Sequence, residues 1–275
     1  MSVVPLRVPA AETAQEPLRL KPAVRLTKVS KRFSNGTLAV EDFSFAFPQH
    51  GFISLLGPSG CGKSTILRMI AGLNRPSSGR IDWPNAVHDA AGQPERNLAF
   101  VFQEATLMPW ATAIANVMLP LRLAGVSKDE ARERSQVALA QVGIDDFANA
   151  YPRELSGGMK MRVSIARAIV ERPRVLLMDE PFAALDEITR FKLNKDLLRL
   201  WQESNFTVVF VTHSVFESVF LSQHVLLMAA RPGRVMARVP VDAPYPRDEL
   251  FRTSAVYNER CRMVLELLGQ ASGHD

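Results

Sequence analysis

A glycine-rich segment between a buried strand and a helix is the feature that most restricts what this chain can fold into. The apolar run 52–56 is followed by the sequence GPSGCGKST, and the helix-forming stretch 66–71 comes directly after it. Glycines let a backbone wrap closely around phosphate oxygens, and the N-terminus of a helix presents free N–H groups and a positive dipole end to them. The pattern GxxxxGK[ST] in this context therefore predicts a phosphate-binding loop.

The side chains of this loop have separate expected tasks. Lys63 supplies a positive charge for the β- and γ-phosphates, Ser64 is the expected Mg²⁺ ligand, and the hydroxyl of Thr65 can reach a phosphate oxygen. Cys61 occupies a variable position, where we expect a small filler without a redox role. The loop residues expected to bind the triphosphate are Gly57, Pro58, Ser59, Gly60, Cys61, Gly62, Lys63, Ser64 and Thr65.

Strand-like runs recur along the chain, with helical patterns between them. Continuous apolar runs occupy residues 52–56, 99–102, 175–178, 207–211 and 225–228. Such runs are typical of strands buried on both faces, and helices between them indicate an α/β fold with a mainly parallel central sheet. We also expect an antiparallel β layer early in the chain and a return strand at 235–239 after the turn Arg231-Pro232-Gly233.

The strand pattern stops between Gln103 and Ser156. Residues 128–142 there predict an amphipathic helix, so we expect an inserted α-helical subdomain at about residues 104–158. The predicted organisation is a disordered tail at 1–22, one large domain at 23–240, and a C-terminal helical appendage at 241–275.

Composition and charge exclude several classes of protein. The sequence has no run of about 18 apolar residues, which predicts no membrane-spanning helix. Its first 22 residues lack the continuous apolar segment of a secretory signal peptide. Cys61 and Cys261 belong to no CxxC or metal-ligand pattern, so a reducing cytoplasmic location is expected. The net charge of +5 arises within the first 34 residues, which gives little support to a nucleic-acid-binding face.

A pair of acidic residues follows another buried strand. Asp179 and Glu180 come directly after the run 175–178, at the sheet edge where ligands bind. Asp179 is placed to hold the Mg²⁺ shell, and Glu180 to polarise the water that attacks the γ-phosphate, as a general base. The alternative is that the two acids only make a strand end soluble.

A second helix start suited to phosphate lies at Leu155-Ser156-Gly157-Gly158-Met159. Ser156 is a good N-cap for a helix over residues 159–171. One triphosphate needs only one such cradle, so two cradles predict a head-to-tail dimer, with each nucleotide between the phosphate loop of one copy and the Ser-Gly-Gly segment of the other. Alternatively, the two glycines form a flexible loop before a helix.

These motifs, in this order, resemble the ATPase subunits of ABC transporters over roughly residues 24–239. The resemblance implies a P-loop NTPase (RecA-like) core, ATP and Mg²⁺ as cofactors, and ATP hydrolysis. The corresponding positions are the phosphate loop 57–65, the Q-loop Gln103, the signature 155–159, the Walker B pair Asp179 and Glu180, the D-loop 184–186 and the switch His213.

By resemblance, further residues receive roles. Gln103 contacts Mg²⁺ and links to the helical subdomain, His213 touches the γ-phosphate, and Phe33 stacks on adenine. Ser156, Gly157, Gly158 and Asp186 contact the ATP of the partner subunit, while Lys63, Gln103, Glu180 and His213 form the catalytic set and Ser64, Gln103 and Asp179 the metal set. Taken alone, Gln103 and His213 could be satisfied surface or core groups, and Phe33 a core aromatic. The chain departs from the common family pattern at Met159, Met161 and Ser214.

Three segments are similar to the nitrate, sulfonate and taurine type of importer ATPases, a subgroup that includes pyrimidine-precursor importers: 102–110, 179–190 and 228–234. This implies a small polar or anionic solute, transmembrane permease subunits, a solute-binding protein, and attachment to the cytoplasmic face of the membrane. Trp110 is either a packed aromatic or a residue near the groove for a permease helix.

Two other functions remain possible at this point. A nucleic-acid- or ribosome-associated ABC ATPase usually has two ATPase units or a long coiled-coil insertion, whereas about 50 residues separate Gln103 from the signature here. A small-molecule P-loop kinase would have no reason for a second phosphate cradle.

Overall fold

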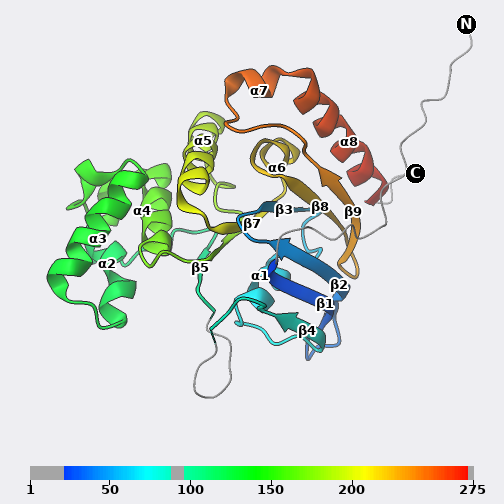
Figure 1. The fold of residues 1–275 in the computed structure, drawn as a ribbon, viewed down its shortest axis with the longest axis horizontal. Coiled ribbons are helices and arrows are strands. Elements are labelled where there is room, and N and C mark those ends of the chain that lie inside the picture. The colour runs from blue at the N-terminus through cyan, green and yellow to red at the C-terminus, as the bar shows by residue number, and fades with distance from the viewer. Residues whose placement is uncertain (1–21, 88–95, 272–275) are drawn as a thin grey trace, which may run out of the picture.

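The strands form two sheets in the computed structural model, which describes residues 22–87 and 96–271 (Figure 1). The larger sheet has the order β5-β6-β7-β3-β8-β9, and the smaller one the order β2-β1-β4. The strands are β1 Pro22–Arg32, β2 Leu38–Pro48, β3 Phe52–Leu56, β4 Ser78–Asp82, β5 Leu98–Val101, β6 Val175–Asp179, β7 Thr207–Thr212, β8 His224–Ala229 and β9 Arg234–Pro240. The tail predicted at 1–22 lies outside the described residues except for Pro22.

The larger sheet is parallel from β5 to β8, and only β9 runs antiparallel to its neighbour β8. The smaller sheet is antiparallel throughout. Both the mainly parallel sheet and the early antiparallel layer are thus confirmed. The strand expected at 99–102 is β5 and lies one residue earlier, because Phe102 has left the sheet and is 37% exposed.

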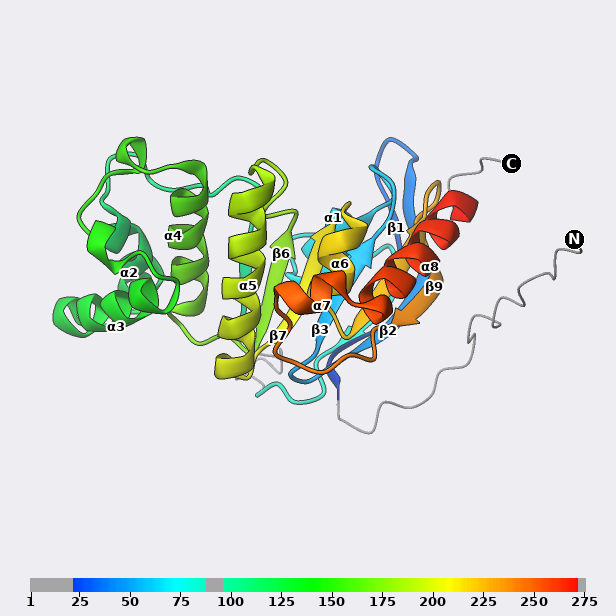
Figure 2. The ribbon, with the colours of Figure 1, turned by 90° about the horizontal axis from the view of Figure 1, so that it is seen from above.

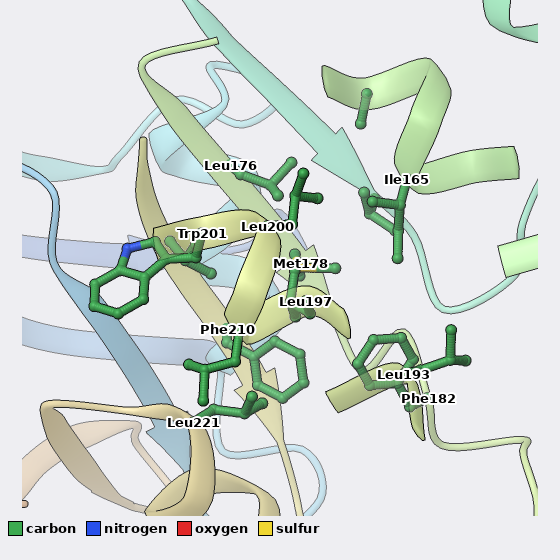
Figure 3. Close-up of a cluster of buried hydrophobic side chains, with 14 of the residues drawn as sticks. Ile165, Leu176, Met178, Phe182, Leu193, Leu197, Leu200, Trp201, Phe210 and Leu221 are labelled. Carbon is green, nitrogen blue, oxygen red and sulfur yellow. The ribbon is translucent and has the colours of Figure 1, made fainter. Parts of the chain in front are cut away.

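Alternate residues of the central strands belong to two different cores. Leu176 and Met178 of β6, and Phe210 of β7, pack in the core that also holds α4, α5, α6 and α8 (Figure 3). Leu177 and Val209 face the other way, into a core shared with α1 and the antiparallel sheet. Burial on both faces explains why these strands are continuously apolar in sequence.

The helices fall into two groups, one packed around the larger sheet and one forming a separate lobe. The first group comprises α1 Lys63–Ile70, α5 Glu187–Ser204, α6 Val215–Leu221, α7 Glu249–Thr253 and α8 Ala255–Ala271. The helices α2 Ala113–Leu123, α3 Lys128–Gln141 and α4 Gly157–Ile169 lie together at one end of the molecule, with 3₁₀ turns at Asp145–Phe147 and Pro152–Glu154 (Figures 1 and 2). Over residues 22–87 and 96–271, no helix has both the length and the apolar character needed to cross a bilayer.

A buried arginine fastens the C-terminal segment to α6. Arg247 is 3% exposed, and its guanidinium donates hydrogen bonds to the carbonyls of Val219, Phe220 and Ser222 at 2.9–3.0 Å. It also donates to the carbonyls of Val241 and Ala243 at 3.1 Å. Because the last carbonyls of a helix have no partner within the helix, Arg247 caps the C-terminal end of α6 while holding the chain that leads to α7 and α8.

Replacing Arg247 should therefore weaken the fold. We predict that Arg247→Ala lowers the free energy of unfolding by about 3 kcal/mol, because several buried carbonyls lose their donor at once. Chemical denaturation of the full chain measures this. The control Arg199→Ala removes a side chain that is 58% exposed and should change the free energy by less than about 0.5 kcal/mol. Equal effects from the two substitutions would contradict the capping role.

Candidate functional site

The phosphate loop lies between the carboxyl end of β3 and the start of α1, as predicted. Gly62 has a φ of 92°, in the left-handed region that favours glycine, and a Cβ there would lie 2.8 Å from the carbonyl oxygen of Ala39. At Gly57 a Cβ would lie 2.5 Å from the carbonyl oxygen of Met228. Side chains are thus excluded at two positions of the loop, which leaves its backbone amides accessible for anions.

Lys63 is buried at the first position of α1. Its side chain is 4% exposed, and Nζ donates to the carbonyls of Gly57 at 2.8 Å and Pro58 at 3.0 Å. The same nitrogen lies 4.0 Å from Oε1 of Glu180. The ammonium is therefore held inside the curve of the loop, next to the acid that follows β6.

Ser64 and Asp179 join the phosphate loop to the end of β6. Ser64 Oγ donates a hydrogen bond of 2.7 Å to Oδ1 of Asp179, which is 8% exposed. Burial raises the pKa of the Asp179 carboxyl above its usual value, although the hydrogen bond from Ser64 opposes this. A hydroxyl and a carboxylate oxygen in contact are ligands of the kind that Mg²⁺ prefers, so these residues fit that metal.

Glu180 and His213 complete the central cluster, which we define as Lys63, Ser64, Asp179, Glu180 and His213. Oε2 of Glu180 lies 3.1 Å from Nδ1 of His213. The backbone of Glu180 has a φ of 47°, which is uncommon for a residue other than glycine. Strand β7 pairs with both β3 and β6. The carboxyl ends of these three parallel strands therefore bring the members of the central cluster together.

Two predicted residues lie at other helix starts. Ser156 caps α4, with its Oγ accepting from the amide of Met159 at 3.3 Å, as its N-cap role predicts. Asp186 caps α5 and accepts from the amide of Thr189 at 2.9 Å, and hydrogen bonds from Thr189 lower the pKa of its carboxyl. Both views show α4 set apart from α1 (Figures 1 and 2). Within residues 22–87 and 96–271, no hydrogen bond or ion pair connects Ser156 to the central cluster.

Three other residues singled out in the sequence, Gln103, Phe33 and Trp110, lie on the surface. Gln103 is exposed, two residues beyond the end of β5. Phe33 follows β1 and is 39% exposed, with Nζ of Lys31 lying 5.4 Å from the centre of its ring. Trp110 is 76% exposed. The alternatives of a core phenylalanine at Phe33 and a packed aromatic at Trp110 are therefore wrong.

A buried acid near His213 is not among the residues that the sequence singled out. Glu217 is 8% exposed, and its Oε2 accepts a 2.6 Å hydrogen bond from the hydroxyl of Thr212, the residue before His213. A signal for it exists in the sequence, because Glu217 is the one charged residue in the otherwise uncharged helix VFESVFL. A carboxylate on such a helix is expected to have a polar partner if it is buried.

The fold and the central cluster define a P-loop nucleotide-hydrolysing protein. A family model described as ABC transporter matches residues 40–183. The chain belongs to the ABC transporter family, as an ATP-binding component and an ATPase that uses ATP with Mg²⁺.

Curated relatives match most of the chain. The Uncharacterized ABC transporter ATP-binding protein MJ0412 of Methanocaldococcus jannaschii is 43% identical over 88% of this chain and 89% of its own length. The Taurine import ATP-binding protein TauB of Rhizobium johnstonii is 46% identical over 77% of this chain and 79% of its own. An Aliphatic sulfonates import ATP-binding protein SsuB of Bacillus cereus is 39% identical, covering 88% of this chain and 94% of its own.

A solved structure has the same fold. The dimeric structure of MJ0796, a bacterial ABC transporter cassette, has a TM-score of 0.69 and 32% identity, and covers 80% of this chain and all of that one. A second dimeric structure of the same cassette, in a post-hydrolysis state with ADP and Pi, matches equally well. These similarities confirm the predicted fold class with its P-loop NTPase core.

Burial should protect both cysteines from thiol reagents. Cys61 is 0% and Cys261 is 4% exposed, burial raises the pKa of the Cys61 thiol, and burial raises the pKa of Cys261 to about 11. Since only the thiolate reacts, we predict negligible alkylation of either residue in the folded chain at pH 7, and full alkylation in denaturant, as measured by mass spectrometry. The control Val137→Cys, at a position 55% exposed, should react when folded. Alkylation of Cys61 as fast as that control would show that the thiol is accessible and refute its assignment as a filler.

Proposed function

We propose that this chain is the ATP-hydrolysing subunit of an importer for a small polar or anionic solute, of the nitrate, sulfonate, taurine or pyrimidine-precursor type. The main observation behind this proposal is that the central cluster lies at one edge of the parallel sheet. Its members are Lys63, Ser64, Asp179, Glu180 and His213. Support for the solute class comes from the names of the taurine and sulfonate relatives.

In the proposed mechanism, the phosphate loop holds the triphosphate. Its backbone amides bind phosphate oxygens, Lys63 binds the β- and γ-phosphates, and the hydroxyl of Thr65 binds another phosphate oxygen. Ser64, Asp179 and Gln103 would hold Mg²⁺, which neutralises negative charge on the phosphates when it is bound. The aromatic face of Phe33 stacks on adenine, and its partial exposure leaves the ring accessible for this.

The hydrolysis step is assigned to Glu180 and His213. Glu180 accepts a proton from the attacking water as general base, and His213 orients the γ-phosphate. Their contact at 3.1 Å supports this assignment, since the base and the residue that touches the phosphate must act on neighbouring atoms.

Two copies complete each site in this proposal. The helix start at Ser156, with Gly157 and Gly158, and the D-loop residue Asp186 contact the ATP that is bound to the phosphate loop of the partner copy. The separation of α4 from α1 supports this arrangement, as does the dimeric form of the solved cassette. ATP then closes the pair of subunits and hydrolysis reopens it.

The domain organisation and the membrane contacts are also proposed. Residues 23–240 form the ATPase cassette, 104–158 its helical subdomain, and 241–275 a C-terminal appendage. The helical subdomain transmits the change at Gln103 to transmembrane permease subunits on the cytoplasmic face, near the exposed ring of Trp110, and a solute-binding protein delivers the solute to the permease. The described insertion between Gln103 and Ser156 contains two helices of 11 and 14 residues, which does not favour a nucleic-acid or ribosome ATPase.

Replacing the general base should separate binding from hydrolysis. We predict that Glu180→Gln lowers kcat for ATP hydrolysis by at least about a hundredfold, while ATP binding persists and the dimer accumulates in the presence of ATP. Phosphate release and size-exclusion chromatography measure the two effects. The exposed Glu203→Gln serves as control and should hydrolyse ATP normally. Near-normal hydrolysis by Glu180→Gln would reject the assigned base.

The transport function needs the complete assembly. We predict that the chain co-purifies with a membrane permease and that the pair, together with a solute-binding protein, takes taurine or an alkyl sulfonate into vesicles only when ATP is supplied. Uptake should stop with the Glu180→Gln variant. ATP-driven export, or failure to associate with any permease, would contradict an importer.

A further inference from the structure

One buried carboxylate, that of Glu217, holds Thr212, the residue before His213, and through it the amide of Ser214. The hydroxyl of Thr212 donates to Oε2 of Glu217 at 2.6 Å, and the amide of Ser214 donates to the Thr212 hydroxyl oxygen at 3.0 Å. The amide of Glu217 in turn donates to Oγ of Ser214 at 3.3 Å. The Glu217 carboxylate thus orients the Thr212 hydroxyl, while the N-cap bond to Ser214 fixes the start of α6, and both contacts hold the turn on which His213 lies.

The other oxygen of Glu217 faces a second loop of the site. Its Oε1 lies 3.8 Å from Nε of Arg190, on α5. Nη2 of the same guanidinium donates a 2.7 Å hydrogen bond to the carbonyl of Leu185, the residue before Asp186. One ion pair therefore connects the segment that carries His213 with the segment that carries Asp186.

The environment makes this ion pair stronger than a typical surface pair. Oε1 of Glu217 and Nε of Arg190 are both buried, and neither has a hydrogen-bond partner within residues 22–87 and 96–271. At 3.8 Å they are too far apart for a hydrogen bond, but their charges attract each other with less screening than in a fully exposed pair. Glu217 is the more buried partner, with a side chain 9% exposed against 28% for Arg190, so loss of the Arg190 charge leaves a buried carboxylate unpaired.

We propose that Arg190 and Glu217 are positioning residues for ATP hydrolysis, which fix the switch segment 212–214 relative to the D-loop segment 184–186. Neither residue contacts the nucleotide in this proposal, because Glu217 acts through Thr212 and Ser214, and Arg190 through Leu185. The inference rests on the proposed roles of His213 and Asp186 in the site.

The test is a double-mutant cycle on the full chain. Glu217→Gln retains an oxygen that can accept from Thr212 but removes the charge, and Arg190→Gln removes the opposite charge. We expect each variant to lower kcat for ATP hydrolysis about tenfold while KM for ATP stays within about twofold, since the pair positions catalytic groups and does not bind ATP. The kcat of the double variant should be no lower than that of the less active single variant. Arg190→Lys keeps the charge and should recover part of kcat.

The exposed pair Lys195–Glu249 provides a matched control. It also begins on α5 and has a nitrogen–oxygen distance of 2.7 Å, but it connects to α7 and to neither loop of the site. Lys195→Gln and Glu249→Gln should leave kcat unchanged.

Several results would overturn the positioning role. They are an unchanged kcat with only a lower unfolding midpoint, a raised KM with a normal kcat, or losses that multiply in the double variant. His213→Ala is measured in parallel: if it retains full kcat, the role assigned to His213 is wrong and the positioning role is lost with it. If His213→Ala is inactive while Glu217→Gln is normal, only the positioning role is wrong. If Glu217→Gln fails to fold, the Arg190 variants test the positioning role instead. They are expected to fold, because the Arg190 side chain is 28% exposed.

Discussion

The 2.7 Å hydrogen bond between Ser64 and Asp179 is the contact on which the rest of the site depends. It joins a helix that begins in a glycine-rich loop to the end of a strand more than a hundred residues later. The contact requires β3 and β6 to be parallel and separated only by β7, so that their carboxyl ends lie at the same edge of the sheet. That arrangement in turn requires the continuously apolar strands and the cores on their two faces.

The members of the central cluster could be predicted from the sequence because each of them follows a strongly apolar run. Lys63 and Ser64 come after β3, Asp179 and Glu180 after β6, and His213 after β7. In a parallel sheet all such positions share an edge, so knowing where the strands end is enough to bring these side chains together. The N-cap at Ser156 could also be predicted, since a serine before two glycines and a helical pattern is a local sequence signal.

Contacts made by tertiary packing could not be predicted in this way. Arg247 and Glu217 are charged residues that the sequence places on helices or loops like any surface group, yet they are 3% and 8% exposed. Their partners are carbonyls or side chains from segments whose proximity only the fold establishes. The pairing of Arg190 with Glu217 is of this kind, because it joins two helices whose relative position depends on the same sheet that organises the central cluster.

We propose above that one nucleotide is held by two copies of the chain, and a structure of the dimer trapped with ATP would show whether this is so. In that structure we expect Lys63 of one copy and Ser156 of the other to contact the same triphosphate. Finding the nucleotide bound by a single copy, with the Ser156 helix start of the second copy away from it, would contradict the claim.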